Sequence, residues 1–246
     1  MKIRKICSAV VFSVGLGCSG MTMAESVIQP VFNEGDSWTY KVSTEKGQSW
    51  SQVRQEYKLT RATEKNLFYS LKVIDSPNPV VNRVSGIDWS VVRDVNGKET
   101  TVNQPLNFPL SVGKSWKVKY TELNPSSNKT HKSEEWIHNY KVIKLESIRV
   151  PAGEFMAYKI EDDGEWIAQI NASSGVSQGA VNNPGNITMV TQIQKNDSRT
   201  ATGKVYKAFW YAPEVKRWIK AIEEYYGNGG TMNERYTSEL ESFSVN

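Results

Sequence analysis

The sequence predicts an all-β protein built on a mainly antiparallel, strongly curved sheet, either an open half-barrel or a sandwich, with little helix beyond a signal peptide. Many short runs of β-branched and aromatic residues follow one another along the chain. Glycine, asparagine and aspartate turns separate these runs, and helical patterns are rare. This combination is typical of antiparallel β domains.

The N-terminus has the pattern of a secretory signal peptide. Lys2, Arg4 and Lys5 precede an apolar run over 6–16, and small residues follow it. A small-x-small site predicts cleavage after Ala24. The apolar run is too short to be a stable membrane span.

The rest of the chain is expected to form one domain. We assign 1–24 to the signal peptide and 25–246 to a single antiparallel β domain, because no linker divides it. A low-complexity stretch at about 171–186 holds only small or polar residues and predicts a flexible loop. No second long apolar run exists, which argues against a transmembrane span, and heavily charged strands argue against an outer-membrane barrel.

Cysteine usage favours an exported bacterial envelope protein. Cys7 and Cys18 both lie in the expected signal peptide, so the mature chain has no disulfide and must be held by its core. We expect it in the periplasm, associated with the outer membrane, or secreted. A lipid anchor at Cys18 is not expected, because Gly15 stands where a lipoprotein signal needs a bulky aliphatic residue.

Net charge gives no reason to expect a nucleic-acid partner. The formal charge of +4 falls to +1 once the three basic residues of the signal peptide are removed, since no acidic residue precedes Glu25. Nucleic-acid binding needs a basic surface, and this balance does not supply one.

The expected strands alternate apolar and polar residues and end at turn residues. Asn96-Gly97 is the clearest hairpin signal, and Asp163-Gly164 predicts a second hairpin. The expected strands cover 38–42, 49–60, 67–74, 80–84, 87–95, 99–102, 116–123, 134–146, 156–161, 165–170, 187–194, 204–210 and 231–245.

One segment, 215–226, fits two structures. Val215, Trp218, Ile219 and Ile222 are spaced as on one face of a helix, but the same residues also fit a strand. Periodicity slightly favours the helix at this point.

Two short motifs mark the beginnings of strand groups. Gly35 comes three residues before Trp38, and Gly113 comes three residues before Trp116. In both, a glycine predicts a tight turn and the tryptophan opens a strand. No reactive group accompanies either motif, so we expect Gly113→Val or Trp116→Ala to lower stability before any activity changes.

These motifs, with two later ones, resemble the TapB-like family of exported bacterial proteins of unknown function. The later marks are 150–155, with Gly153 and Phe155, and 210–215, with Trp210 and Pro213. The marks span nearly the whole mature chain in a consistent order. The resemblance implies a curved antiparallel sheet, with a strand over 217–226, and implies no established reaction, ligand or cofactor. The family has glycine where this chain has Lys216, which puts the turn there in question.

The chain offers little catalytic chemistry, and we expect no enzyme, no metal and no cofactor. His131 and His138 lack a third candidate zinc ligand. Glu134-Glu135 and 161–163 are acidic runs beside tryptophans, as a glycan hydrolase would show. Adjacent residues on a strand point to opposite faces, however, which weakens a carboxylate pair.

Eight tryptophans are the most unusual feature of the composition, and all lie in the mature chain. Trp38, Trp116 and Trp210 belong to the family marks and are expected in the core. Trp50, Trp89 and Trp166 have charged or turn neighbours, so these three are the candidate ligand-binding residues.

Three functions remain open from the sequence. The leading one is a non-catalytic envelope protein that binds an apolar or amphipathic ligand, or a protein partner, on a curved aromatic-rich sheet. The second is a structural or accessory subunit of a cell-surface assembly, joined through a strand edge. The third is a carboxylate-dependent glycan hydrolase, which needs two carboxyl groups in one cleft.

Overall fold

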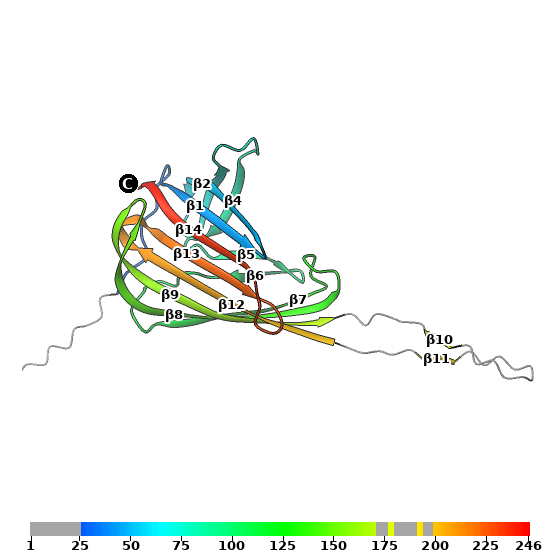
Figure 1. Ribbon diagram of the computed structural model, residues 1–246. Coiled ribbons are helices and arrows are strands. Elements are labelled where there is room, and N and C mark those ends of the chain that lie inside the picture. The colour runs from blue at the N-terminus through cyan, green and yellow to red at the C-terminus, as the bar shows by residue number, and fades with distance from the viewer. Residues whose placement is uncertain (1–25, 171–176, 180–190, 194–198) are drawn as a thin grey trace, which may run out of the picture.

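The protein is dominated by one antiparallel sheet of ten strands (Figure 1). This computed structural model describes residues 26–170, 177–179, 191–193 and 199–246. The strand order is β4-β3-β2-β1-β14-β13-β12-β9-β8-β7. From one edge to the other the strands are β4 (Val81–Gly86), β3 (Asn66–Val73), β2 (Ser49–Ala62), β1 (Ser37–Lys46), β14 (Met232–Ser244), β13 (Arg217–Tyr226), β12 (Arg199–Ala212), β9 (Gly153–Ile170), β8 (His131–Val150) and β7 (Ser115–Leu123).

Two smaller pairs complete the described strands. β5 (Val91–Val95) and β6 (Lys98–Asn103) form a separate hairpin, and β10 (Ser177–Gly179) pairs with β11 (Thr191–Ile193). The signal peptide assigned to 1–24 lies outside the described residues. The loop predicted at 171–186, and the strand predicted at 187–194, also lie outside them, except for β10 and β11.

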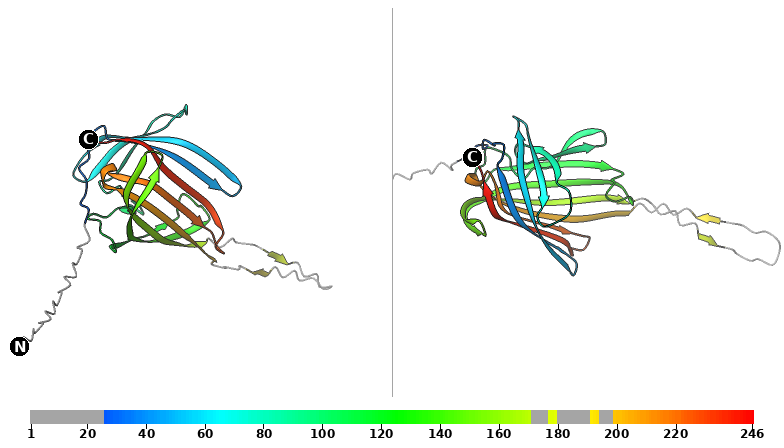
Figure 2. Two further views of the ribbon diagram at one scale, coloured as in Figure 1. Left: turned by 60° about the vertical axis from the view of Figure 1, so that its left-hand side comes forward. Right: turned by 90° about the horizontal axis from the view of Figure 1, so that it is seen from above.

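The sheet is strongly curved and does not close on itself (Figures 1 and 2). The all-β, mainly antiparallel prediction is therefore confirmed. The core fills the concave side, where Phe32, Trp89, Leu106 and Leu110 come from outside the large sheet and pack on its inner face. The one helical element in the described residues is a 3-10 turn, Pro213–Val215. None of those residues forms a helix long and apolar enough to cross a membrane.

The two glycine-tryptophan motifs form the turns that the sequence predicts. Gly35 has φ +93° and Gly113 has φ +91°, a backbone region that residues with a Cβ seldom occupy. Trp38 lies one residue into β1 and is fully buried, and Trp116 lies one residue into β7 against the core. In each motif the glycine therefore makes the turn before a strand, and the tryptophan at the start of that strand packs in or against the core.

A side chain at Gly113 should cost stability through backbone strain alone. No atom lies within 4 Å of the position where a Cβ would be added, so steric overlap is not the cause. We expect Gly113→Ala to lower the free energy of unfolding by about 1–2 kcal/mol, the cost of a Cβ in a left-handed conformation. Gly113→Asn is the matched control and should lose less, because asparagine tolerates this region. Urea unfolding of the two variants measures the difference, and equal losses would contradict the strain account.

The hairpin predicted at Asp163-Gly164 is wrong. β9 runs without interruption from Gly153 to Ile170, because Gly164 is paired on one side with His138 and on the other with Val205. A Cβ on Gly164 would lie 3.0 Å from Nδ1 of His138. This glycine serves a close approach of the imidazole, and the pairing of two neighbouring strands overrides its turn propensity.

The strand predicted over 87–95 also needs correction. Trp89 has φ +60° and sits in a turn whose backbone closes from Gly86 to Ser90, so β5 begins only at Val91. That turn carries the Trp89 ring into the core, where it makes edge contacts with Trp38 and Phe32. The buried ring explains why the chain leaves the strand here.

Residues 217–226 form a strand, as the family resemblance implied and periodicity alone did not. Lys216, where the TapB-like resemblance implies a glycine, has φ +60° and closes the 3-10 turn. Its ammonium group donates to Oδ2 of Asp36 at 3.0 Å and to the backbone carbonyl of Asn246 at 2.5 Å. The lysine thus adopts the left-handed turn and ties it to buried Asp36.

Candidate ligand-binding face

The three candidate tryptophans lie in different environments. Trp50 is 63% exposed near the β1–β2 turn, and Trp89 is 3% exposed in the core. Trp166 lies half-buried on β9 and faces the concave side. The structure does not bring the three together, and a role for each in binding stays a prediction.

Trp166 belongs instead to a row of rings on the concave face of β7, β8 and β9. Consecutive ring centroids are 5.4–6.2 Å apart, and most pairs are stacked. We call these six residues the aromatic row: Trp116, Tyr140, His138, Trp136, Trp166 and His131. Even-numbered residues of β8 share one face, so a single strand supplies three of its rings at regular spacing.

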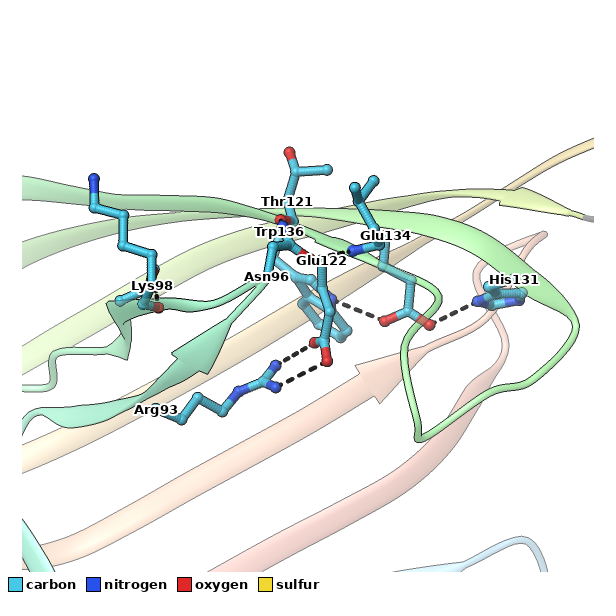
Figure 3. A network of polar contacts seen from close by, with 10 residues as sticks. Arg93, Asn96, Lys98, Thr121, Glu122, His131, Glu134 and Trp136 are labelled. Atoms are coloured by element: carbon cyan, nitrogen blue, oxygen red, sulfur yellow. Dashed lines mark hydrogen bonds and ion pairs between the residues drawn. The ribbon is translucent and has the colours of Figure 1, made fainter.

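Two buried carboxylates contact the rings of the row, and Figure 3 shows the first of them, Glu134. Oε1 of Glu134 lies 2.6 Å from Nδ1 of His131, and Oε2 accepts a 3.0 Å hydrogen bond from Nε1 of Trp136. One β9 residue repeats the arrangement, since Oδ2 of Asp162 lies 2.6 Å from Nδ1 of His138. Both carboxylates are buried, at 6% and 0% exposure. These contacts fix the orientations of the rings. Rigidly held side chains suit a binding site better than mobile ones do.

The β5–β6 hairpin closes the outer side of this face (Figure 3). Arg93 makes a bidentate contact with Glu122 of β7, at 3.0 and 2.5 Å. Asn96 donates to the carbonyl of Thr121 and accepts from the backbone N–H of Leu123. These two bonds use the Asn96 side chain to pair backbone groups of Thr121 and Leu123. The turn of the β5–β6 hairpin therefore covers part of the outer edge of β7.

A cavity of about 270 Å³ lies beside Trp166, one ring of the row. Its wall includes Gly203 of β12 and the turn over 227–230 between β13 and β14. A Cβ on Gly203 would overlap both the Tyr226 carbonyl oxygen and Nε1 of Trp166. The glycine therefore makes room for the indole ring.

Gly203→Ala should move the Trp166 ring and lower stability. Overpacking of this kind costs about 1–3 kcal/mol. We expect a lower midpoint in urea together with a shift in tryptophan emission of the folded protein. Thr202→Ala is the control, since Thr202 is exposed on the neighbouring position and should change neither. An unchanged emission spectrum in Gly203→Ala would show that the ring does not depend on this glycine.

The acidic runs separate as strand geometry predicts. Glu134 and Asp162 are buried on the concave side, whereas Asp163 is exposed and Glu135 is half-buried. Each buried carboxylate is engaged with a histidine rather than free in a cleft. In the described part of the chain, no group of three His, Cys, Asp or Glu side chains is placed to hold a metal ion. The absence of catalysis and of a metal stays a prediction.

Sequence reasoning missed the partners of both histidines and one buried arginine. Glu134 follows His131 by three residues, a spacing that could have suggested contact across a bulge. Asp162 meets His138 only through strand pairing, which a single sequence does not reveal. Arg217 is 3% exposed and lines a second cavity on the concave face. Its position two residues from buried Val215 and Ile219 was the available signal.

Comparison with known proteins finds two solved structures of low similarity to this chain. No protein-family model matches the chain, and no curated protein matches it. A protein from Parabacteroides distasonis described as a lipoprotein is 14% identical, with TM-score 0.47, over 89% of this chain and 100% of its own. A protein from Bacteroides fragilis described as exported, with a YmcC-like fold, is 15% identical, with TM-score 0.42, over 89% and 99%. The TapB-like resemblance stays a prediction, since no family model supports it.

Proposed function

We propose that this chain is an exported, non-catalytic protein of the bacterial cell envelope that binds an apolar or amphipathic ligand on the concave face of its sheet. Export is supported by the pattern of the first 24 residues, from three basic residues to the small-x-small site. The observation that carries the binding function is the aromatic row. Its members Trp136 and Trp166 are half-buried and lie against each other, and Trp166 lines a cavity.

Aromatic rings held in this way suit binding better than catalysis. Flat rings offer large apolar contact area at little conformational cost, and their faces accept apolar chains and the faces of sugar rings. The carboxylates that a hydrolase would use accept hydrogen bonds from the same row. Their role is to orient rings, which supports a site without a reaction of its own.

The test is binding of an apolar fluorescent probe, N-phenyl-1-naphthylamine, to the mature protein and three variants. We expect Trp136→Ala and Trp166→Ala each to weaken binding about tenfold, equivalent to about 1.4 kcal/mol. Trp50→Ala tests the candidate from the sequence that lies outside the row, at a 63% exposed position. If the row alone forms the binding face, this variant binds as the wild type does. If all three variants bind equally well, the row is not the binding face.

A second candidate rests on the exposed edge of the sheet. β4 is an outer strand of the described sheet, and Val81 and Val84 on it are 42% and 55% exposed. Exposed edge strands can pair with a strand of another protein. A structural or accessory subunit of a surface assembly would use β4 in this way and would copurify with partner subunits.

A further inference from the structure

Arg217 is a buried cation without a compensating anion. Its side chain emerges from the first residue of β13 and is 3% exposed. Nε and Nη1 have no hydrogen-bond partner, and no carboxylate of the described chain lies within ion-pair distance of the guanidinium. A buried charge without a partner destabilises the fold, because the group loses its hydration and gains no ion pair in exchange.

Five aromatic rings surround the guanidinium, and we call them the arginine cage. The carbon Cζ of Arg217 lies 3.9–5.6 Å from their centroids. The cage consists of Trp38, Tyr40, Tyr57, Trp89 and Trp218. Ring faces stabilise the charge of a cation above them, but they give no acceptor to N–H groups in the guanidinium plane. The cage thus surrounds the guanidinium, while Nε and Nη1 are buried without an acceptor.

The same arginine lines a cavity of about 240 Å³ between β1, β2, β13 and β14. Tyr40, Tyr57 and Trp218 of the cage share its wall with Glu223, also of β13, and with Tyr236 of β14. This volume falls below the roughly 300–1,000 Å³ of pockets for drug-sized ligands. It suits a single charged group with a small body attached.

Glu223, Tyr40 and Tyr236 of the wall do not neutralise the positive charge of Arg217. Glu223 is engaged elsewhere, with Nζ of Lys207 at 3.5 Å and with the hydroxyl of Tyr225, which donates to it at 3.1 Å. Burial is the larger cause, and a hydrogen bond to Glu234 the second, that raises the pKa of Tyr236 to about 12. Burial also raises the pKa of Tyr40, so both phenols are neutral at physiological pH.

We propose that this cavity binds the carboxylate or phosphate group of a small amphipathic ligand, with Arg217 as the oxyanion-binding residue. A guanidinium presents two parallel N–H groups to such an oxyanion, and a dry aromatic surround strengthens the contact. The apolar part of the ligand then extends over the rings of the concave face. This inference rests on the proposed function, and it adds that the ligand carries a negatively charged group.

The experiment compares charged and neutral partners of equal size on the mature protein. D-glucuronate and glycerol 3-phosphate are the oxyanion probes, D-glucose and glycerol are their neutral counterparts, and sodium chloride matches ionic strength. The readouts are Tm and intrinsic tryptophan emission, because Trp89 and Trp218 contact the guanidinium. We expect at least one oxyanion to raise Tm and change emission, with no response to the neutral compounds.

Three variants assign the effect to Arg217. Arg217→Met keeps the length of the side chain and should abolish the oxyanion response while leaving Tm unchanged or higher, because a buried unpaired charge is removed. Arg217→Lys keeps the charge but loses the paired donors, and should weaken oxyanion binding about tenfold. Arg83→Met removes an exposed arginine on β4 and should respond as the wild type does.

Three outcomes would overturn the inference. They are no wild-type response to either oxyanion, a response that survives in Arg217→Met, or a marked fall in the Tm of Arg217→Met, which would make the arginine a structural cation of its cage. Arg217→Lys gives a second test that does not depend on the stability of Arg217→Met, because oxyanion binding equal to that of the wild type would also decide against the inference. Binding of N-phenyl-1-naphthylamine that still depends on Trp136 and Trp166 would then leave the proposed function standing.

Discussion

Trp38→Ala is expected to lower the free energy of unfolding by about 3–5 kcal/mol, the range for removing a large aromatic side chain from a packed core. Trp38 is fully buried, and its Nε1–H donates to the carbonyl of Val215 at 2.8 Å. Its ring also packs edge-on against Trp89 at 5.4 Å. The substitution therefore leaves a cavity and also an unpaired buried carbonyl, which both cost free energy.

Urea unfolding monitored by circular dichroism measures this loss. Trp50→Ala is the matched control, because it removes the same side chain where it is 63% exposed, and it should change stability by no more than about 0.5 kcal/mol. Similar losses in the two variants would show that Trp38 is not the anchor between β1 and the 3-10 turn.

Asp36→Asn is expected to lower the free energy of unfolding by about 3–5 kcal/mol, as breaking a buried ion pair does. The carboxylate is fully buried and accepts from Nζ of Lys216 at 3.0 Å and from the backbone N–H groups of Asn33 and Asn246 at 3.0 and 2.9 Å. One side chain thus joins the start of β1 to the turn before β13 and to residue 246. Asparagine keeps the shape but leaves the lysine without its counter-charge.

An exposed ion pair of the same length provides the comparison. Arg149 and Glu154 are also 3.0 Å apart, but their side chains are 83% and 55% exposed. Glu154→Gln should produce no measurable change, because water and salt screen exposed pairs. In the double variant Asp36→Asn, Lys216→Met, the combined loss should be smaller than the sum of the single losses. Strict additivity in that cycle would contradict a direct interaction between the two residues.

Local chemistry made much of the fold predictable. Glycines at 35 and 113 and the Asn96-Gly97 turn occupy left-handed conformations that few other residues accept, so their turns follow from identity alone. Alternation in the strands likewise follows from the packing of one face on the core. The continuity of β9 was harder to predict, because pairing with β8 and β12 outweighs the turn propensity of Asp163-Gly164.

Little of the candidate site could be read from the chain. The aromatic row and the His138–Asp162 contact depend on the register between β8 and β9. This register brings Nδ1 of His138 to 2.6 Å from Oδ2 of Asp162, although the two residues are 24 positions apart in the sequence. The arginine cage draws on three strands and the turn at Trp89. A sequence shows which rings exist, and only the tertiary pairing decides which of them meet.

Native mass spectrometry of the protein purified from the periplasm tests the central claim, binding of a ligand on the concave face. We expect the wild type to carry a small-molecule mass that collisional activation releases, and the double variant Trp136→Ala, Trp166→Ala to carry less of it or none. Trp50→Ala, purified in the same way, tests the predicted binding residue outside the row and should retain the ligand if the row is the binding face. A wild type that is free of ligand, or that travels only with partner subunits, would contradict the account and favour an assembly subunit.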